Sequence, residues 1–213
     1  MTDVWSARAE RYGSSALHRE GPDLDLLAEW AGPGEGRTAL DVASGGGHLA
    51  RRLREAGFAV TTVDRAPGMR PDVICSAEDL PFAAETFDVV ATRIAPHHFD
   101  DVQAAVNELA RVSRDLVLVE DCLYVGEAAE EADRLRDPTH VRCYSAGEWR
   151  DFLARAAVEL EEVRVVERLV EVESWLALAG CEGDAAARVR ALVEDFVEDG
   201  LLRESFVLLK GRK

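Results

Sequence analysis

The chain has 213 residues, of which 47% are hydrophobic, and these values are typical of one globular domain. Its 41 acidic residues outnumber its 25 basic residues, so the formal net charge is −16. This balance disfavours nucleic acid and anionic lipid as partners, since both attract dense lysine and arginine. We therefore expect neither a nucleic-acid nor a membrane partner; the sequence leaves the oligomeric state open.

Targeting and metal-binding patterns are also missing from the sequence. No segment has the roughly 18 consecutive apolar residues of a membrane helix, and the first residues do not resemble a secretory signal. We expect a cytoplasmic protein. The four cysteines are far apart in the sequence and form no Cys-x-x-Cys pair, so we predict structural thiols and no metal site.

Short β-rich runs alternate with amphipathic helical stretches along the chain, which indicates βαβ units and a largely parallel sheet. The predicted strands cover residues 38–43, 58–64, 72–75, 87–92, 115–120, about 163–172 and 205–209. Apolar residues at helical spacing predict helices near 49–56, 102–112, 149–156 and 189–197. The fold class is therefore α/β, with seven mostly parallel strands flanked by helices.

The connection between the second and third strands is unusually short. Only residues 65–71 separate them, and this segment contains Pro67 and Pro71. A parallel crossover with its helix normally needs at least about 10–12 residues. We expect the helix here to be absent or reduced to one turn.

A glycine-rich turn follows the first strand, with the sequence Asp41-Val-Ala-Ser-Gly-Gly-Gly-His48. Glycines let the backbone turn tightly and approach a ligand, and the helix that follows offers free N–H groups. Asp64, at the end of the second strand, can accept hydrogen bonds from two ribose hydroxyls. This combination predicts a nucleotide-type cofactor, either a nicotinamide dinucleotide or S-adenosylmethionine (SAM).

The small residues at 43, 45 and 47 resemble the D-x-G-x-G-x-G motif of class I SAM-dependent methyltransferases rather than the G-x-G-x-x-G of dinucleotide sites. Ala43 replaces the first glycine, which is tolerated if its φ is negative. The segments 76–82 and 87–90 resemble the ubiquinone/menaquinone-biosynthesis type of this class, and the segment 93–99 resembles the one that lies beneath the methionine part of SAM. Similarity to one bacterial branch extends to the segments 12–24, 136–142 and 148–149.

The resemblance implies a Rossmann-like methyltransferase whose last strand is antiparallel, with SAM as cofactor. It implies an N-terminal cap over residues 1–24 and a substrate lid over residues 122–145, both within a single domain 1–213. The cofactor-binding residues it implies are Asp41, Ala43, Ser44, Gly45, Gly47, Asp64, Arg65, Ser76, Ala77, Glu78, Arg93, Tyr12 and Ser15.

Methyl transfer needs mainly alignment, and a base only where the acceptor loses a proton. Histidine changes its charge near neutral pH, so His18, His98 and His140, which lie in the resembling segments, are the candidate catalytic residues. His97 and His98 are adjacent, and in an extended chain they point to opposite sides, with His98 toward the cleft.

The predicted function is methyl transfer from SAM to a small molecule, and the resemblance implies carbon methylation of an aromatic or quinone-like ring. One alternative is a SAM-binding regulatory protein without turnover. A nicotinamide-dependent oxidoreductase is the other, and it is disfavoured by the glycine spacing and the lack of a Tyr-x-x-x-Lys pair after the fourth strand.

Overall fold

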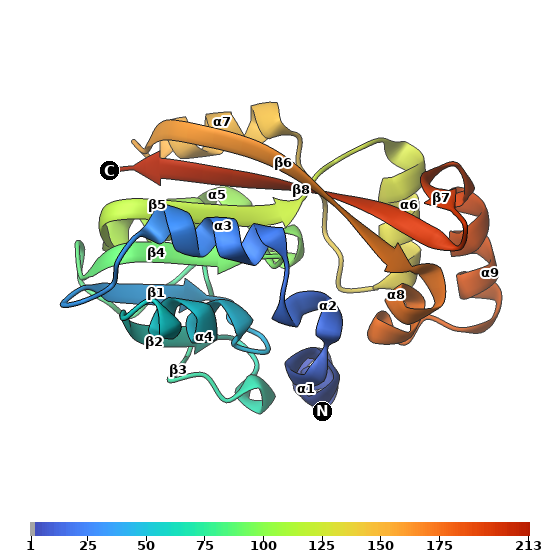
Figure 1. Ribbon diagram of the computed structural model, residues 1–213, viewed down its shortest axis with the longest axis horizontal. Coiled ribbons are helices and arrows are strands. Elements are labelled where there is room, and N and C mark those ends of the chain that lie inside the picture. Colours follow the sequence, from blue (N-terminus) through green and yellow to red (C-terminus); the bar gives the residue numbers. More distant parts are fainter. Residues whose placement is uncertain (1–2) are drawn as a thin grey trace.

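The computed structural model describes residues 3–213 (Figure 1). One sheet runs through the molecule in the order β3-β2-β1-β4-β5-β8-β6, with a short β7 paired to β8. Its strands are β1 (Thr38–Val42), β2 (Ala59–Asp64), β3 (Val73–Ile74), β4 (Phe87–Arg93), β5 (Ser113–Cys122), β6 (Glu159–Glu171), β7 (Val197–Glu198) and β8 (Leu201–Arg212). The pairs among β1 to β5 are parallel, whereas β8 is antiparallel to both β5 and β6. The predicted Rossmann-like fold with an antiparallel last strand is confirmed.

Helices cover both faces of the sheet (Figure 1). They are α1 (Val4–Ser14), α2 (Ala16–Arg19), α3 (Pro22–Ala31), α4 (His48–Glu55), α5 (Val102–Val112), α6 (Glu127–Arg136), α7 (Ala146–Arg155), α8 (Val172–Ala179) and α9 (Gly183–Leu192). Successive β5 residues alternate between two apolar cores: Val117 packs with α5 and α7, and Leu118 with α3 and α4. Both faces of the parallel strands are therefore buried, as their continuous apolar runs predict.

A second lobe extends beyond the sheet at the right of Figure 1. The long antiparallel strands β6 and β8 run out of the sheet and meet α6, α8 and α9 there. This lobe has its own apolar core, which includes Val170, Trp175, Val189 and Leu202. The sequence pattern does not predict a separate core in this region.

The short crossover is confirmed: a single 3-10 turn, Pro67–Met69, replaces the helix between β2 and β3. The N-terminal helix α1 packs on this turn instead. Ser6 Oγ accepts a 2.8 Å hydrogen bond from the backbone N–H of Gly68, and a Cβ on Gly68 would lie 2.6 Å from the Cα of Ser6. Helix α1 therefore lies in the space that a crossover helix would otherwise fill, near the carboxyl ends of the strands.

The prediction of one helical face over residues 189–197 is wrong at its end. Helix α9 stops at Leu192, a 3-10 turn follows, and Val197 begins β7. The turn between β7 and β8 contains Asp199 and Gly200 with φ of 51° and 77°. An Asp-Gly pair with positive φ at both positions is a strong hairpin signal, and the sequence analysis overlooked it.

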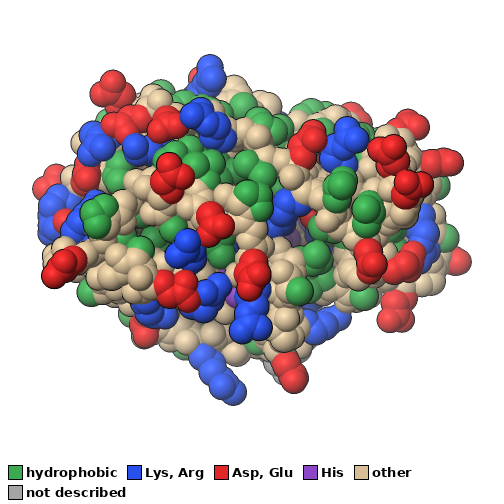
Figure 2. Space-filling view, viewed as in Figure 1, with side chains coloured by type: hydrophobic (Ala, Val, Ile, Leu, Met, Phe, Trp, Pro, Cys, Tyr) green, Lys and Arg blue, Asp and Glu red, His purple; other side chains and the backbone are tan. Residues whose placement is uncertain are grey.

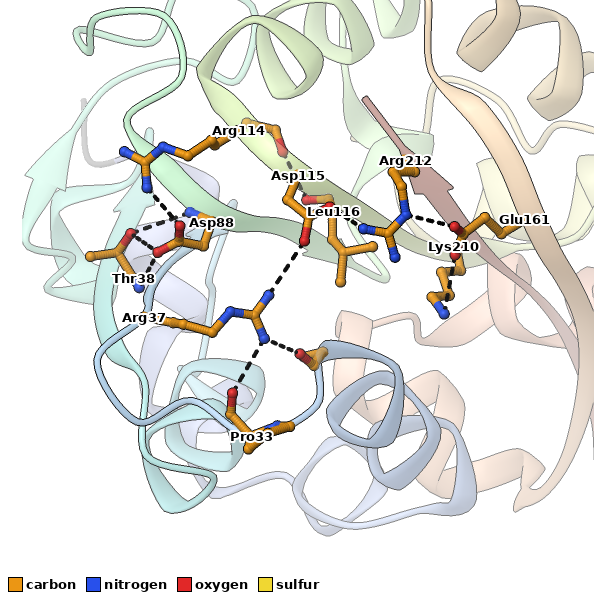
Figure 3. Close-up of polar contacts among 12 residues, drawn as sticks. Pro33, Arg37, Thr38, Asp88, Arg114, Asp115, Leu116, Glu161, Lys210 and Arg212 are labelled. Carbon is orange, nitrogen blue, oxygen red and sulfur yellow. Dashed lines mark hydrogen bonds and ion pairs between the residues drawn. The ribbon is translucent and has the colours of Figure 1, made fainter.

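At the opposite edge, where the parallel strands begin, polar side chains join the strand ends (Figure 3). Asp88 accepts hydrogen bonds from the backbone N–H and the hydroxyl of Thr38, at 2.8 and 2.9 Å. Arg114 donates to its other oxygen at 2.6 Å. This network locks β1 to β4 far from the pocket described below.

Replacing Asp88 with Ala should therefore lower the free energy of unfolding by about 1–3 kcal/mol, because the Thr38 N–H loses its acceptor. The matched control is Asp115→Ala: this carboxylate is 37% exposed, against 20% for Asp88, and pairs with Arg37 and Arg212 (Figure 3). Its loss should cost under about 1 kcal/mol. Urea denaturation measures both variants. Equal destabilisation by the two substitutions would contradict the expectation that Asp88 stabilises the fold more than Asp115.

Within the described residues 3–213, no helix combines the length and apolar character needed to cross a membrane.

Candidate functional site

One pocket lies at the carboxyl ends of β1, β2 and β4, between the sheet, the N-terminal helices and the second lobe. Most predicted site residues line it: Tyr12, His18, Asp41, Ala43, Ser44, Gly45, Asp64, Arg65, Ser76, Ala77, Glu78, Arg93 and His98. Ser15, Gly47 and His140 are not among its lining residues. The predicted positions thus converge on one cavity, with these three at its margin.

The glycine-rich turn between β1 and α4 forms one wall of the pocket. Ala43, Gly45 and Gly47 all have positive φ, of 56°, 49° and 72°. The expectation of a negative φ at Ala43 is wrong, because the turn needs left-handed backbone at each alternate position. Gly47 caps the start of α4. A Cβ built on Gly45 meets no atom within 4 Å, so this stretch of backbone faces open space that a ligand can approach.

Ala43→Gly should stabilise the protein by up to about 1 kcal/mol. The left-handed conformation costs a residue with a Cβ roughly 1–2 kcal/mol, which the greater backbone freedom of glycine partly offsets. We expect a higher thermal midpoint. Gly47→Ala, at a position where φ is also positive, is the converse control and should destabilise. A lower thermal midpoint for Ala43→Gly would show that the left-handed backbone at Ala43 is not strained.

Asp64 ends β2 and anchors the glycine turn. Its Oδ2 accepts from the backbone N–H of Gly45 and its Oδ1 from that of Ala66, both at 2.9 Å. The side chain is nearly buried, and this burial raises its pKa despite the two hydrogen bonds. Each carboxylate oxygen has a second lone pair, so Asp64 keeps the capacity to accept ribose hydroxyls.

Asp41 points from β1 toward α4, where its Oδ2 accepts from the backbone N–H of Ala50 at 2.9 Å. Burial raises its pKa to about 7. The carboxyl therefore holds the start of α4 in place behind the glycine turn.

Ser76, Ala77 and Glu78 form the wall of the pocket next to Asp64. The Ser76 hydroxyl donates to Glu78, whose other oxygen accepts from the backbone N–H of Asp100 at 3.1 Å. Arg65 lies at the rim with an exposed side chain, 3.3 Å from Asp100. These contacts shape a polar wall with the Ala77 methyl group between two polar side chains.

The N-terminal helices close another side of the pocket. His48 Nε2 lies 2.9 Å from the backbone oxygen of Tyr12, and Ser15 Oγ lies 2.9 Å from His18 Nδ1. Burial, together with Arg93 and Arg168, lowers the pKa of His18 to about 3, so this ring is neutral. Ser15 thus acts on the pocket through His18 rather than by lining it.

Arg93 is nearly buried, and each nitrogen of its guanidinium donates a hydrogen bond within the protein. Its guanidinium donates to Asp23 and Glu120 and, at 3.1 Å, to the backbone oxygen of His18. Burial raises the pKa of Glu120 to about 8 in spite of Arg93. Arg93 therefore links β4, β5 and the N-terminal helices beneath the pocket.

The adjacent histidines do not point to opposite sides as expected, because Pro96–His98 forms a 3-10 turn rather than extended chain. Both rings line the pocket, and their centroids are 4.0 Å apart. His98 packs edge-on against Trp5 at 4.6 Å, and its Nδ1 lies 3.0 Å from the backbone oxygen of Thr139. Burial and the neighbouring His97 lower the pKa of His98 well below its usual value.

His97 is a site residue that the sequence analysis did not select. Its Nδ1 lies 2.6 Å from Oδ1 of Asp121 at the end of β5, and both side chains are buried. Burial opposes its protonation, but Cys122 and Asp121 outweigh this and raise the pKa of His97 well above its usual value. The pair forms a histidine–carboxylate dyad facing the pocket.

His140 lies behind this dyad. Its ring centroid is 5.4 Å from that of His97, and its Nε2 lies 3.2 Å from Glu130. The backbone oxygen of His97 accepts from the N–H groups of Val141 and Arg142. The segment after α6 is thus fixed directly to the turn that carries both pocket histidines.

The structure also brings together two cysteines that are distant in sequence. Leu123 and Tyr144 form a parallel bridge, so the preceding residues Cys122 and Cys143 are neighbours, and both line a second, smaller pocket. Trp5 is another lining residue not selected from the sequence. Tertiary pairing brings all three into place, and the local sequence carries no signal of it.

Comparisons with known proteins agree with this geometry. Residues 40–117 match the family model of a methyltransferase domain. The chain is 29% identical to the methyltransferase YcgJ of Bacillus subtilis over 209 residues, covering 87% of this chain and 82% of that protein. A solved structure of a Bacillus halodurans protein described as a methyltransferase superposes with a TM-score of 0.79 at 27% identity, covering 91% of this chain and 99% of that one.

A further relative is the demethylmenaquinone methyltransferase of Mycolicibacterium paratuberculosis. It is 34% identical over 91 residues, which are 39% of this chain and 40% of that protein. The fold, the glycine turn and these matches define the class: the chain is a Rossmann-like, SAM-dependent methyltransferase. Residues 40–117, which match the methyltransferase-domain model, carry the glycine turn, Asp64 and the wall from Ser76 to Glu78.

Proposed function

We propose that the pocket binds SAM and transfers its methyl group to a small molecule. The observation that carries this proposal is the convergence of Asp64, the open backbone of Gly45 and the wall at Ser76–Glu78 on one cavity. Asp64 would accept the ribose hydroxyls, and the glycine turn would lie against the aminocarboxypropyl chain. When bound, SAM supplies a methyl group on a positively charged sulfur, which is a good leaving group.

The acceptor would reach the methyl group beneath the cap 1–24 and the lid 122–145, within a single domain 1–213; residues 1 and 2 of this cap lie outside the described part. Cap and lid are joined by Arg8 of α1, which pairs with the buried Asp137 at 2.7 Å and donates to the backbone oxygen of Ala179 at 3.0 Å. This contact supports their opening and closing as one unit, with water excluded during transfer.

His97 is the group best placed to take a proton from the acceptor. With Nδ1–H donating to Asp121, Nε2 is the nitrogen left with a free lone pair, and Asp121 would stabilise the imidazolium that forms. The acceptor atom would attack the methyl carbon, the carbon–sulfur bond would break, and the proton would pass to His97. His98, His18 and His140 would then orient the acceptor or hold His97 in place.

Similarity to a demethylmenaquinone methyltransferase supports carbon methylation of a quinone-like ring as one candidate. A protic acceptor methylated on oxygen or nitrogen is the other, and the His97–Asp121 dyad favours it.

Isothermal titration with SAM, S-adenosylhomocysteine (SAH) and NAD(H) tests the cofactor. We expect binding of both sulfur compounds in the micromolar range and no binding of NAD(H). Screening of acceptors with labelled methyl groups then tests turnover. Binding of NAD(H) alone would overturn the proposal, and SAM binding with no methylated product across the screen would favour the regulatory alternative.

A further inference from the structure

The second lobe builds one end of the pocket. Arg136 of α6, Arg168 of β6, Trp175 of α8, and Glu204 and Phe206 of β8 line it. All five lie outside the matched domain 40–117. The residues at this end are therefore not part of the matched methyltransferase segment, and they are candidates for recognising the acceptor.

Two guanidiniums at this end are mostly buried and have few partners. Arg136 is 13% exposed and donates one hydrogen bond, to the backbone oxygen of Trp175 at 3.3 Å. Arg168 is 11% exposed and also donates one, to the backbone oxygen of Leu17 at 3.0 Å. Their nearest carboxylates, Asp133, Asp23 and Glu204, stand 3.9 Å away. A guanidinium has five donors, so most of theirs stay unused.

Arg93 shows what a saturated buried arginine looks like in this protein. At 5% exposure it donates to two carboxylates and one backbone oxygen. By contrast, the Nε atoms of Arg136 and Arg168 and the Nε1 of Trp175 are buried without any acceptor among residues 3–213. Unpaired buried donors are costly, and three of them border one end of one pocket.

Both guanidiniums also stack on aromatic rings. Arg136 lies 4.3 Å from the centroid of Trp175, and Arg168 lies 4.1 Å from that of Phe206. Stacking fixes a planar guanidinium and leaves its N–H edge to bind an anion in two-point fashion. The rings themselves offer an apolar surface next to that edge.

The charge at this end is positive. Burial raises the pKa of Glu204 although Arg168 and Arg136 oppose it, so the one carboxylate lining this end is a weak counter-charge. Figure 2 shows Lys and Arg side chains gathered around the lower centre of this face, near α1 and α4, while acidic side chains crowd the outer side of the second lobe. At this end of the pocket itself, Arg136 and Arg168 face the single lining carboxylate of Glu204, and this excess of positive charge favours an anion although the chain has a net charge of −16.

We propose that Arg136 and Arg168 anchor an anionic group, a carboxylate or phosphate, on an acceptor whose apolar or aromatic body packs against Trp175 and Phe206. This inference rests on the proposed methyltransferase function and names its substrate class as small organic anions. It requires Arg136 and Arg168 to bind the acceptor and not SAM.

The test titrates SAH-loaded protein with benzoate, phenylphosphonate and uncharged benzamide. We expect an anion to bind at least about tenfold more tightly than benzamide, a difference of ~1.4 kcal/mol. Tighter binding of benzoate would identify a carboxylate, and tighter binding of phenylphosphonate a phosphate. Arg136→Met and Arg168→Met should each weaken anion binding about tenfold and leave SAH affinity within about twofold.

Arg188→Met is the matched control, since Arg188 is exposed on α9 and pairs with Glu131 away from the pocket. It should bind the anions like the unmodified protein. Arg136→Lys keeps the charge and should retain part of the affinity, which separates loss of the anchor from misfolding. The inference would be overturned if neither benzoate nor phenylphosphonate bound more tightly than benzamide, or if either Met variant lost SAH binding. Failure of the unmodified protein to bind SAH would instead refute the proposed function.

Discussion

Asp64→Ala should weaken SAM and SAH binding by about 100-fold or more. The variant would lose the acceptor for two ribose hydroxyls, and hydrogen bonds to a charged group contribute roughly 1.5–3 kcal/mol each. It would also free the backbone N–H groups of Gly45 and Ala66, so the glycine turn would lose its anchor. Isothermal titration measures the affinity, and far-ultraviolet circular dichroism reports whether the fold persists.

Two further variants separate these roles of Asp64. Asp64→Asn keeps one carbonyl oxygen for Gly45 or Ala66 and should retain more stability than Asp64→Ala while still binding SAH poorly. Asp88→Ala removes a carboxylate that, like Asp64, accepts a hydrogen bond from a backbone N–H, but at the opposite edge of the sheet. It should leave SAH affinity unchanged. SAH affinity within a few-fold of the unmodified protein for Asp64→Ala would remove the central assignment of the site.

The cofactor half of the site could be predicted from sequence because it is local. The glycine turn and the Ser76–Glu78 wall each follow a strand and Asp64 ends one, and parallel strands end at the same edge of a sheet. The positions of these residues are determined by buried strands and by the turns that follow them, and both leave a pattern in the sequence. Even here the φ of Ala43 was not predicted, since no pattern distinguishes an alanine in left-handed backbone from one in extended chain.

The acceptor half depends on contacts between distant segments. Arg136, Arg168 and Trp175 lie in three elements that meet only because β6 and β8 extend beyond the sheet. From sequence, Arg136 falls within the expected lid 122–145 and Arg168 within a predicted strand, and no local pattern brings the two together. The same holds for His97, which becomes a site residue through Asp121, 24 positions away. Long-range pairing of this kind has no periodic signature.

His97→Ala should reduce kcat by about 10²- to 10⁴-fold for an acceptor that loses a proton, the usual contribution of a positioned base. SAH affinity should change only a few-fold, because His97 lies at the methyl-acceptor side. Labelled-methyl turnover with an acceptor from the screen measures kcat. An unchanged kcat would show that the acceptor needs no base, as expected for an already ionised oxygen or an electron-rich ring carbon.

The pH profile distinguishes a base from a merely structural histidine. Only neutral His97 can accept a proton, so the rate should rise with pH through its pKa, which Asp121 and Cys122 hold above the usual histidine value. Asp121→Asn removes the carboxylate and lowers that pKa, so the rise should move to lower pH while the plateau rate falls. Nuclear magnetic resonance titration of the His97 ring in the SAH complex gives the same pKa without an acceptor. If His97 served only to pack the pocket, Asp121→Asn would shift the ring pKa and leave the midpoint of the rate profile where it was.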